Sequence, residues 1–327
     1  MKLEDITPFV RITRIEEKIP PGSELIPLDH RIFYCISGEG ELEIDGNIID
    51  MKKVLIVVAA VVAAVVMGAC SEGRDTLTVI SYNMRVGTAD DGENSWENRR
   101  RATPIMLRDK MPDIFGVQEA LDFQVDYIME NCPEYASVGV GRDDGAEKGE
   151  YMSIFWNVSH IEMKDWGTFW LSETPDVPSR GWDAACRRTA TWALMKDKRN
   201  GREFYYVNTH LDHRGREAQK NGLALIVARI KEINPQGIPM ILTGDFNVKP
   251  GAEALTSLEG YMQDARSMAV HTDTLASFTG WGKRVDVLDY VYYSDFASCD
   301  TFETVVDEYD GVPYISDHYP VKAVLVW

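Results

Sequence analysis

Polar residues that could bind a metal ion follow short apolar runs along this chain of 327 residues. Each run has the length of a buried strand, and a carboxylate, amide or imidazole comes directly after or before it. The residues are Asn83, Glu119, His210, Asp245, Asn247, Asp317 and His318. Strand ends are where distant parts of an α/β protein converge on one site. We therefore expect these side chains to lie close together.

The chemistry of this set points to a divalent cation. Carboxylates and amides that converge would repel one another or lack partners unless a cation lay between them. Oxygen ligands suit Mg²⁺, with Mn²⁺ or Ca²⁺ as alternatives, and histidine can give or take a proton near neutral pH. Attack on a phosphate ester needs a cation, an oriented water and a proton source. Each motif alone is common in turns, so the prediction depends on their number and order.

The elements that must position these residues alternate between strand-like and helix-like patterns from Thr76 onward. Strands are predicted at residues 77–81, 114–117, 153–156, 191–196, 204–209, 240–243, 288–293 and 321–326. Helices are predicted at residues 96–110, 217–233 and 252–258. No long linker or repeat interrupts the series, so one α/β domain is expected. The sequence pattern alone does not separate a parallel sheet from two mixed sheets.

The order of the motifs resembles that of the endonuclease/exonuclease/phosphatase superfamily, also called DNase I-like. The matching segments are residues 81–83 (SYN), 112–119 (PDIFGVQE), 208–212 (NTHLD), 243–247 (TGDFN), 288–291 (LDYV) and 316–320 (SDHYP). The resemblance covers the chain from Thr76 to its C-terminus. It implies a two-sheet, four-layer α/β sandwich in which both sheets are mixed and the site lies at one end.

The resemblance also implies the ligands of the metal. Glu119 corresponds to the principal Mg²⁺ ligand, with Asn83 and Asp317 nearby. Asp245 and Asn247 correspond to the pair that positions the attacking water and the phosphate.

The two histidines receive partners in the same way. The resemblance implies that His318 is a general base or an acid directed at the phosphate, and that His210 stabilises phosphate charge or protonates the leaving group. Glu150 corresponds to the acid that partners His210, and Asp289 to the acid that partners His318. Arg188 corresponds to an arginine that reaches toward the substrate phosphate, although an ordinary surface arginine is nearly as good an interpretation.

Asp286 is a rival for the role of Asp289, because Arg284, Val285 and Asp286 resemble the Arg-apolar-Asp pattern of the family. In a regular strand Asp289 shares a face with Val291 and Tyr293, whereas Asp286 lies on the other face. We therefore favour Asp289.

Residues 51–70 have the form of a bacterial lipoprotein signal. Lys52 and Lys53 precede an apolar run of roughly 16 residues, shorter than the roughly 20 that span a membrane, and small residues precede Cys70. We expect export and a lipid anchor on Cys70 at the bacterial outer membrane, on its periplasmic or surface side, with a transmembrane helix as the alternative. Residues 71–327 would form the endonuclease/exonuclease/phosphatase domain.

Residues 1–50 precede the expected signal and resemble the first strands of a cupin barrel, cut off halfway. Half a barrel cannot close its sheet. We expect these residues to be extraneous and Met51 to be the biological start, with an appended partner domain as the alternative.

The charge of the chain narrows the classes of function. A protein that grips a long nucleic acid needs a basic face, but the formal net charge here is -18. We expect a monomer that forms no stable nucleic-acid complex and hydrolyses a small or lipid-head phosphate ester, either a monoester or a diester. An endonuclease or exonuclease on DNA or RNA is the alternative. A non-catalytic surface binding module is a further alternative, but it should lack a key residue, and none is missing.

Overall fold

The computed structural model describes residues 75–327 and two short strands near the N-terminus. These two strands, β1 (Glu41–Ile44) and β2 (Asn47–Asp50), pair antiparallel. The chain divides into two compact units, Met1–Gly73 and Arg74–Trp327. The signal and anchor predicted at residues 51–70 lie outside the described residues, as does most of the segment that resembles a cupin. Within the described part of the chain, no helix has both the length and the apolarity to cross a membrane.

One sheet of the second unit has six strands in the order β11-β13-β10-β9-β8-β7. Their bounds are β7 (Ile161–Trp170), β8 (Thr189–Asp197), β9 (Glu203–His210), β10 (Met240–Asp245), β11 (Gln263–Asp264) and β13 (Asp289–Ser294). β9 and β10 run parallel, and the other neighbouring pairs are antiparallel. The sheet is therefore mixed.

The other sheet has seven strands in the order β12-β14-β15-β3-β4-β6-β5. Their bounds are β3 (Thr76–Asn83), β4 (Ile114–Gln118), β5 (Tyr135–Val138), β6 (Ile154–Asn157), β12 (His271–Thr272), β14 (Ser298–Thr304) and β15 (Val321–Val326). β3 pairs parallel with β4 and β12 with β14, while the remaining pairs are antiparallel. This sheet is mixed as well.

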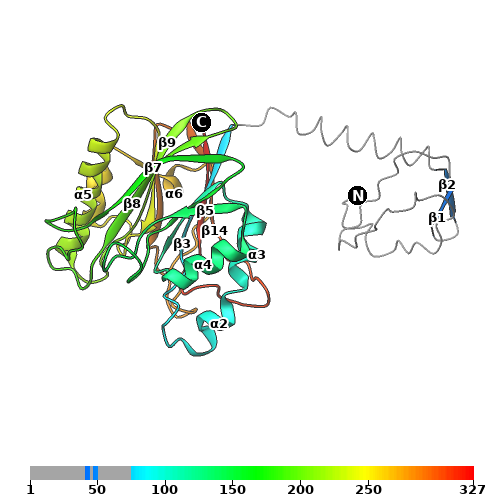
Figure 1. Ribbon diagram of the computed structural model, residues 1–327, viewed down its shortest axis with the longest axis horizontal. Coiled ribbons are helices and arrows are strands. Elements are labelled where there is room, and N and C mark those ends of the chain that lie inside the picture. The colour runs from blue at the N-terminus through cyan, green and yellow to red at the C-terminus, as the bar shows by residue number, and fades with distance from the viewer. Residues whose placement is uncertain (1–40, 45–46, 51–74) are drawn as a thin grey trace. The chain divides into compact units, whose positions relative to one another are not determined.

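Helices cover the outer face of each sheet, as Figure 1 shows for α5 on one side and α3 and α4 on the other. Their bounds are η2 (Gly92–Asn94), α2 (Trp96–Arg99), α3 (Ala102–Lys110), α4 (Asp122–Asn131), α5 (Arg216–Ile233), η3 (Glu253–Leu258) and α6 (Ala265–Met268). One apolar core lies between the sheets, a second between the seven-stranded sheet and α2 to α4, and a third between the six-stranded sheet and α5 with η3. The predicted two-sheet, four-layer sandwich is confirmed.

Two of the predicted helices differ from the structure. The segment 96–110 forms two helices, α2 and α3, because Pro104 has no N–H to donate to the carbonyl of Arg100 and the helical ladder is interrupted there. Pro104 is tolerated in the first turn of α3, where no intrahelical donor is needed. The segment predicted as a helix at 252–258 is the 3-10 helix η3.

The residues that face the gap between the sheets change character along each central strand. In β3, Leu77 and Val79 belong to the apolar core, and Ser81 and Asn83 follow at every second position. The same change runs from Phe204 and Tyr206 to Asn208 and His210 in β9, from Ile241 to Thr243 and Asp245 in β10, and from Tyr293 and Val291 to Asp289 in β13. Asp245 is paired in register with both His210 and Asp289. One end of the gap is therefore polar.

A layer of buried polar side chains separates this polar end from the apolar core. Gln118 donates from Nε2 to Asn208 Oδ1 at 2.7 Å and to Ser81 Oγ at 3.2 Å, and Thr243 Oγ1 donates to Asn208 Oδ1 at 3.2 Å. Asn208 crosses from one sheet to the other only because Gly116 faces it, since a Cβ there would lie 2.5 Å from the amide. The layer ties the two sheets together beneath the site.

Candidate active site

Asn83 lies between two carboxylates at the end of β3. Its Nδ2 donates to Glu119 Oε1 at 3.0 Å and to Asp245 Oδ2 at 2.9 Å. Its Oδ1, the atom that would bind a metal, accepts the backbone N–H of Arg85 at 3.0 Å. The structure therefore brings Asn83 to the predicted place, but with the amide nitrogen toward the carboxylates and the oxygen engaged elsewhere.

Glu119 is held in a strained conformation. Its φ of 61° is in the left-handed region, which costs a non-glycine residue about 1–3 kcal/mol and occurs mainly at functional sites. Its Oε2 accepts the backbone N–H of Val86 at 3.1 Å. Burial acts to raise the pKa of Glu119, but the hydrogen bond from Asn83 and the charge of His318 outweigh it and lower the pKa. Glu119 is therefore an ionised carboxylate directed into the site.

Buried carboxylates crowd around this centre. Burial raises the pKa of Asp245 to about 7, with the charges of Asp289 and Glu119 adding to the effect and that of His318 opposing it. Burial also raises the pKa of Asp317. One oxygen each of Glu119 and Asp245 and a nitrogen of His210 lie within 4.8 Å of one another, close enough to share an ion. A hard divalent cation fits this donor set and would relieve the repulsion.

His318 and Asp289 form a buried hydrogen-bonded pair. His318 Nδ1 is 2.7 Å from Asp289 Oδ2, and His318 Nε2 is 3.6 Å from Asp245 Oδ2. Burial disfavours the imidazolium, but the charges of Asp289 and Asp245 outweigh this and raise the pKa of His318 to about 10. Asp286 instead forms an ion pair with Lys249 at 2.5 Å. The structure thus places Asp289, and not Asp286, against His318.

His210 lies near the same oxygen of Asp245 but has a different protonation state. Its Nε2 is 3.4 Å from Asp245 Oδ2. Asn247 Nδ2 lies 2.9 Å from this nitrogen and also donates to the carbonyl of Leu211 at 3.0 Å, so His210 Nε2 accepts and the ring proton belongs on Nδ1. Burial, followed by the charge of Arg188, lowers the pKa of His210 well below its usual value. His210 is therefore neutral.

Glu150 lies near His210, but its carboxylate pairs with Arg142 and not with the histidine. Arg142 donates to it from both terminal nitrogens, at 2.5 and 2.8 Å. Glu150 Oε2 is 4.0 Å from His210 Nδ1, too far for a hydrogen bond, and that nitrogen has no hydrogen-bond partner among the described residues. Arg142 was not among the residues predicted from the sequence. It lies on a glycine-containing loop without periodicity, so no pattern indicated it.

Asn247 follows Asp245 in a tight turn. Its φ of 52° is left-handed, and its backbone N–H donates to Asp245 Oδ1 at 2.8 Å. The same residue therefore orients the carboxylate through its backbone and His210 through its side chain. This arrangement gives a physical reason for an Asp-x-Asn spacing at the end of β10.

Arg188 is buried, with 5% of its surface exposed, so it is not a surface arginine. Its Nη2 is 3.1 Å from His213 Nδ1, and its Nε is 3.6 Å from Asp212 Oδ2. Neither its Nε nor its Nη1 makes a hydrogen bond within residues 75–327. A buried guanidinium with unused donors can accept an anionic ligand.

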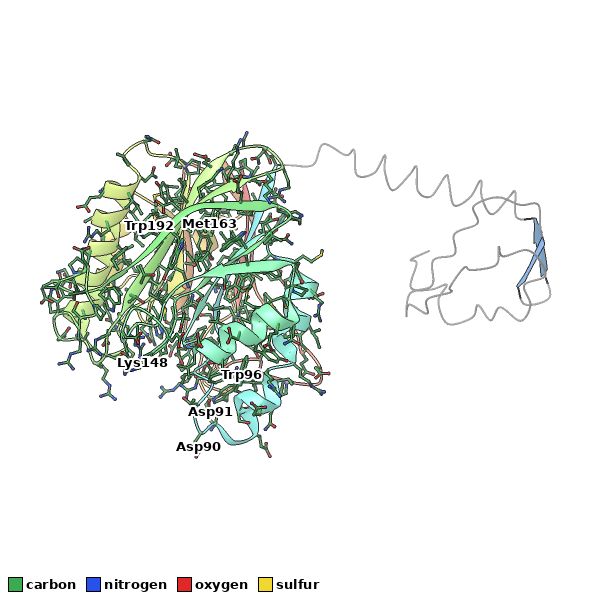
Figure 2. All side chains as sticks on the ribbon, in the orientation of Figure 1. Asp90, Asp91, Trp96, Lys148, Met163 and Trp192 are labelled. Carbon is green, nitrogen blue, oxygen red and sulfur yellow. The ribbon has the colours of Figure 1, made fainter. Side chains whose placement is uncertain are left out.

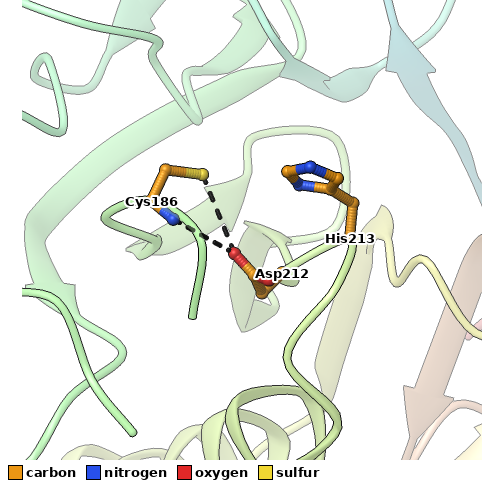
Figure 3. A group of neighbouring side chains, drawn as sticks. All are labelled: Cys186, Asp212 and His213. Carbon is orange, nitrogen blue, oxygen red and sulfur yellow. Dashed lines mark hydrogen bonds between the residues drawn. The ribbon is translucent and has the colours of Figure 1, made fainter. Parts of the chain in front are cut away.

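Asp212 lies between Cys186 and His213 in a cluster that resembles a metal site (Figure 3). Its Oδ1 accepts the backbone N–H groups of Arg214 at 2.9 Å and Gly215 at 2.8 Å, and its Oδ2 accepts that of Ala185 at 3.0 Å. Burial opposes ionisation, but the bonds from Gly215 and Arg214 outweigh it and lower the pKa of Asp212 to about 2. Its oxygens are already engaged, so the cluster joins two loops beside Arg188 instead of offering a second cation site.

Residues 80–318 match the Endonuclease/Exonuclease/phosphatase family. The chain belongs to this family. It is similar to the endonuclease/exonuclease/phosphatase from Bacteroides vulgatus, with 35% identity, coverage of 76% of this chain and 98% of that one, and a TM-score of 0.73. It is also similar to the mannosyl-6-phosphatase Bt3783 of Bacteroides thetaiotaomicron VPI-5482, with 34% identity, coverage of 77% and 100%, and a TM-score of 0.74. The protein L388 of Acanthamoeba polyphaga mimivirus, which is uncharacterized, is 26% identical over 251 residues, 70% of this chain and 91% of that one.

Membership in the endonuclease/exonuclease/phosphatase family indicates an enzyme that hydrolyses phosphoesters, as a phosphatase or a nuclease. The family generally uses a divalent metal, and the cluster of Glu119, Asp245 and His210 is a candidate for holding one. The resemblance noted in the sequence is thereby confirmed for the family and the fold.

Proposed function

We propose that this protein is a divalent-metal-dependent phosphoesterase that acts on a small phosphate ester, with a sugar phosphate as the first candidate. The observation that carries the proposal is the arrangement around Asp245 Oδ2, which has the neutral His210 at 3.4 Å and the protonated His318 at 3.6 Å. Two imidazoles in different protonation states near one carboxylate oxygen can take part in proton transfer at a reacting phosphate.

Glu119 and Asp245, which lie close enough to share an ion, would hold the cation with Asp317 near Glu119, and Mg²⁺ is favoured because these three side chains offer carboxylate oxygens. When bound, the cation would neutralise the charge that develops on the phosphate oxygens. Asn83 would position the carboxylates of Glu119 and Asp245, because its amide nitrogen donates a hydrogen bond to each of them.

The remaining residues would act on the ester itself. His318 would hold positive charge and a proton toward the phosphate, since Asp289 keeps its pKa high. Asn247 would fix the orientation of His210 by donating to Nε2, and His210 would present the N–H of Nδ1, which has no hydrogen-bond partner among the described residues. Arg188 would direct its free N–H groups at a phosphate oxygen, a contact that matches guanidinium geometry.

Two observations support a small substrate over a nucleic acid. The relative at 34% identity is a mannosyl-6-phosphatase, and the chain covers all of that protein. The formal net charge of -18 opposes binding to a polyanion. The D. rerio TDP2 that was solved in complex with single-strand DNA product is 18% identical to this chain. This likeness shows a shared fold and does not support a shared substrate.

The proposed activity is tested with the full chain on mannose 6-phosphate, p-nitrophenyl phosphate, bis-p-nitrophenyl phosphate and single-stranded DNA. We expect Mg²⁺-dependent release of phosphate from at least one monoester, a loss of activity with excess EDTA, and recovery when Mg²⁺ or Mn²⁺ is added back. Hydrolysis that is insensitive to chelation, or cleavage of DNA alone, would contradict the proposal. Phosphate release is followed colorimetrically.

We further propose that the protein is exported and anchored to a bacterial outer membrane through lipid on Cys70. The basis is the sequence of residues 51–70, which has a basic start, a short apolar run and small residues before the cysteine. In bacteria that express the chain and are labelled with a clickable palmitate, wild-type protein should carry label, whereas Cys70→Ser should not. Cys132→Ser is the matched control, because Cys132 is a buried free thiol of the folded unit. Equal labelling of Cys70→Ser and wild type would rule out this anchor.

A further inference from the structure

Arg85 places a fixed positive charge among three carboxylates at the edge of the metal centre. Asp91 accepts two hydrogen bonds from it, from Nε and from Nη2, each at 3.0 Å. Its Nη1 is 3.9 Å from Glu119 Oε2, and its Nε is 3.9 Å from Asp317 Oδ2. Asp91 lies on the loop that leads into α2, near the lower end of the view in Figure 2. The guanidinium therefore lies where two proposed metal ligands and a third carboxylate converge.

The backbone of Arg85 is held in place by buried side chains. Its φ of 57° is left-handed, a conformation that is unfavourable for a residue with a Cβ and that the surrounding structure must hold in place. Its N–H donates to Asn83 Oδ1, and its carbonyl accepts from Arg99 Nη2 and from Gln124 Nε2, each at 3.1 Å. Arg99 is 1% exposed and Gln124 is fully buried. The position of the guanidinium is thus specified by the fold and is not a chance surface contact.

We propose that Arg85 takes the place of a second cation, so that the active site binds a single divalent ion. The proposal rests on the proposed function only in that Glu119 and its neighbours hold a divalent metal. It assigns a role to Arg85 and Asp91, which lie outside the set of residues predicted from the sequence.

The electrostatics of the three carboxylates support this assignment. In two-metal phosphoesterases the ions lie about 3.5–4 Å apart, each held by carboxylates that bridge or flank them. The guanidinium of Arg85 already provides a positive charge 3.9 Å from Glu119 and from Asp317. The pKa of Arg85 is raised by the hydrogen bonds to Asp91, with burial opposing, so the charge persists at every working pH. A second divalent ion would have to displace a cation that is covalently part of the chain.

Removal of the guanidinium should therefore create a second metal site. Arg85→Ala leaves Asp91, Glu119 and Asp317 facing a space without a cation, which is a donor set suited to Mn²⁺. The full chain is titrated with Mn²⁺, and bound ions are counted by electron paramagnetic resonance. Only ions whose binding is abolished by Glu119→Gln are assigned to the active site. We expect one ion per chain in wild type and two in Arg85→Ala, with the spin coupling of a Mn²⁺ pair in the variant only.

Three further variants separate this role from a structural one. Arg85→Lys keeps the charge and should bind one ion. Arg101→Ala removes an arginine that is 75% exposed and pairs with Asp310 at 3.0 Å, so it should also bind one ion. Arg85→Ala combined with Asp91→Asn lacks the third carboxylate and should return to one ion. Arg85→Gln, which keeps side-chain bulk, replaces Arg85→Ala if circular dichroism shows that the alanine variant is unfolded.

The proposal is overturned if wild type binds a coupled pair of Mn²⁺ ions, or if folded Arg85→Ala and Arg85→Gln still bind one. These outcomes are independent of catalysis. A wild-type protein that binds one ion but hydrolyses no ester would contradict the proposed function and leave the role of Arg85 intact. A wild-type protein that hydrolyses esters with two coupled ions would contradict the role of Arg85 alone.

Discussion

Glu119→Gln should lower kcat/KM for the best ester substrate by about 10³-fold, on the order of 4 kcal/mol of transition-state stabilisation. The substitution keeps the shape of the side chain and the left-handed backbone at φ 61°, so the folded structure should persist. It removes the carboxylate charge that would bind the cation beside Asn83 and Asp245. The loss should appear in kcat as well as in Mg²⁺ affinity, measured by steady-state kinetics across a range of Mg²⁺ concentrations.

Glu147→Gln is the matched control, because Glu147 is exposed on the loop between Gly145 and Gly149. It removes the same charge from the acidic chain and should leave kcat/KM within about twofold, since surface substitutions away from a site rarely matter. Glu119→Gln protein that retains more than a tenth of wild-type activity at saturating Mg²⁺ would contradict the assignment of Glu119 as the principal ligand.

His318→Ala should lower kcat by about 10²–10⁴-fold, the range for loss of a residue that transfers protons. Asp289→Asn is the more informative variant, because it leaves the imidazole present and removes one charge that raises its pKa. The protonated form of His318 exists below its pKa, so activity that needs it falls as pH rises through that value. With Asp289 neutralised, the pKa of His318 drops and the alkaline limb of the pH–rate profile should move to lower pH by more than about one unit.

The pH profile is measured as kcat/KM from pH 5 to pH 10 in wild type, Asp289→Asn and Asp286→Asn. Asp286 is ion-paired with Lys249 and does not contact His318, so its variant should keep the wild-type limb. A profile that is unchanged in Asp289→Asn, or one that moves toward higher pH, would exclude a proton-donating His318 held by Asp289.

The pair of His318 and Asp289 also makes the free energy of unfolding depend on pH. Because the folded-state pKa of His318 is about 10 and lies above its usual value near 6.5, its contribution to folding is fully present below pH 6.5. That contribution is lost as the pH rises through about 10.

Much of this site could be predicted from the sequence because strand periodicity fixes which residues share a face. The two-residue period of a strand predicted that Asp289 shares a face with Val291 and that Asp286 lies on the other face. In the structure, Asp289 Oδ2 lies 2.7 Å from His318 Nδ1. The two-sheet sandwich followed from the resemblance of the ordered strand-end motifs to a known family, and the similar solved structures confirm it. These features depend on local pattern and on the identity of short motifs.

Other features depend on tertiary structure that no local pattern records. β7 was not predicted, because it is an edge strand whose alternation is broken by a bulge between Met163 and Asp165 and by half-exposed positions. The bond from Arg142 to Glu150 depends on the path of an irregular loop. The placement of Arg85 depends on a left-handed backbone and on contacts with Arg99 and Gln124, which are distant in the sequence.

The alternation along the central strands has a consequence for how this enzyme can fail. The same face of each central strand supplies both core residues and active-site residues, at every second position. A shift of β9 by one residue would therefore turn Asn208 and His210 away from the gap between the sheets and put Val207 and Thr209 in their place. Such a shift would expose the apolar core and dismantle the site in one event. Misfolded chains would then be catalytically silent, and any turnover in a preparation would come from molecules whose two sheets are correctly aligned.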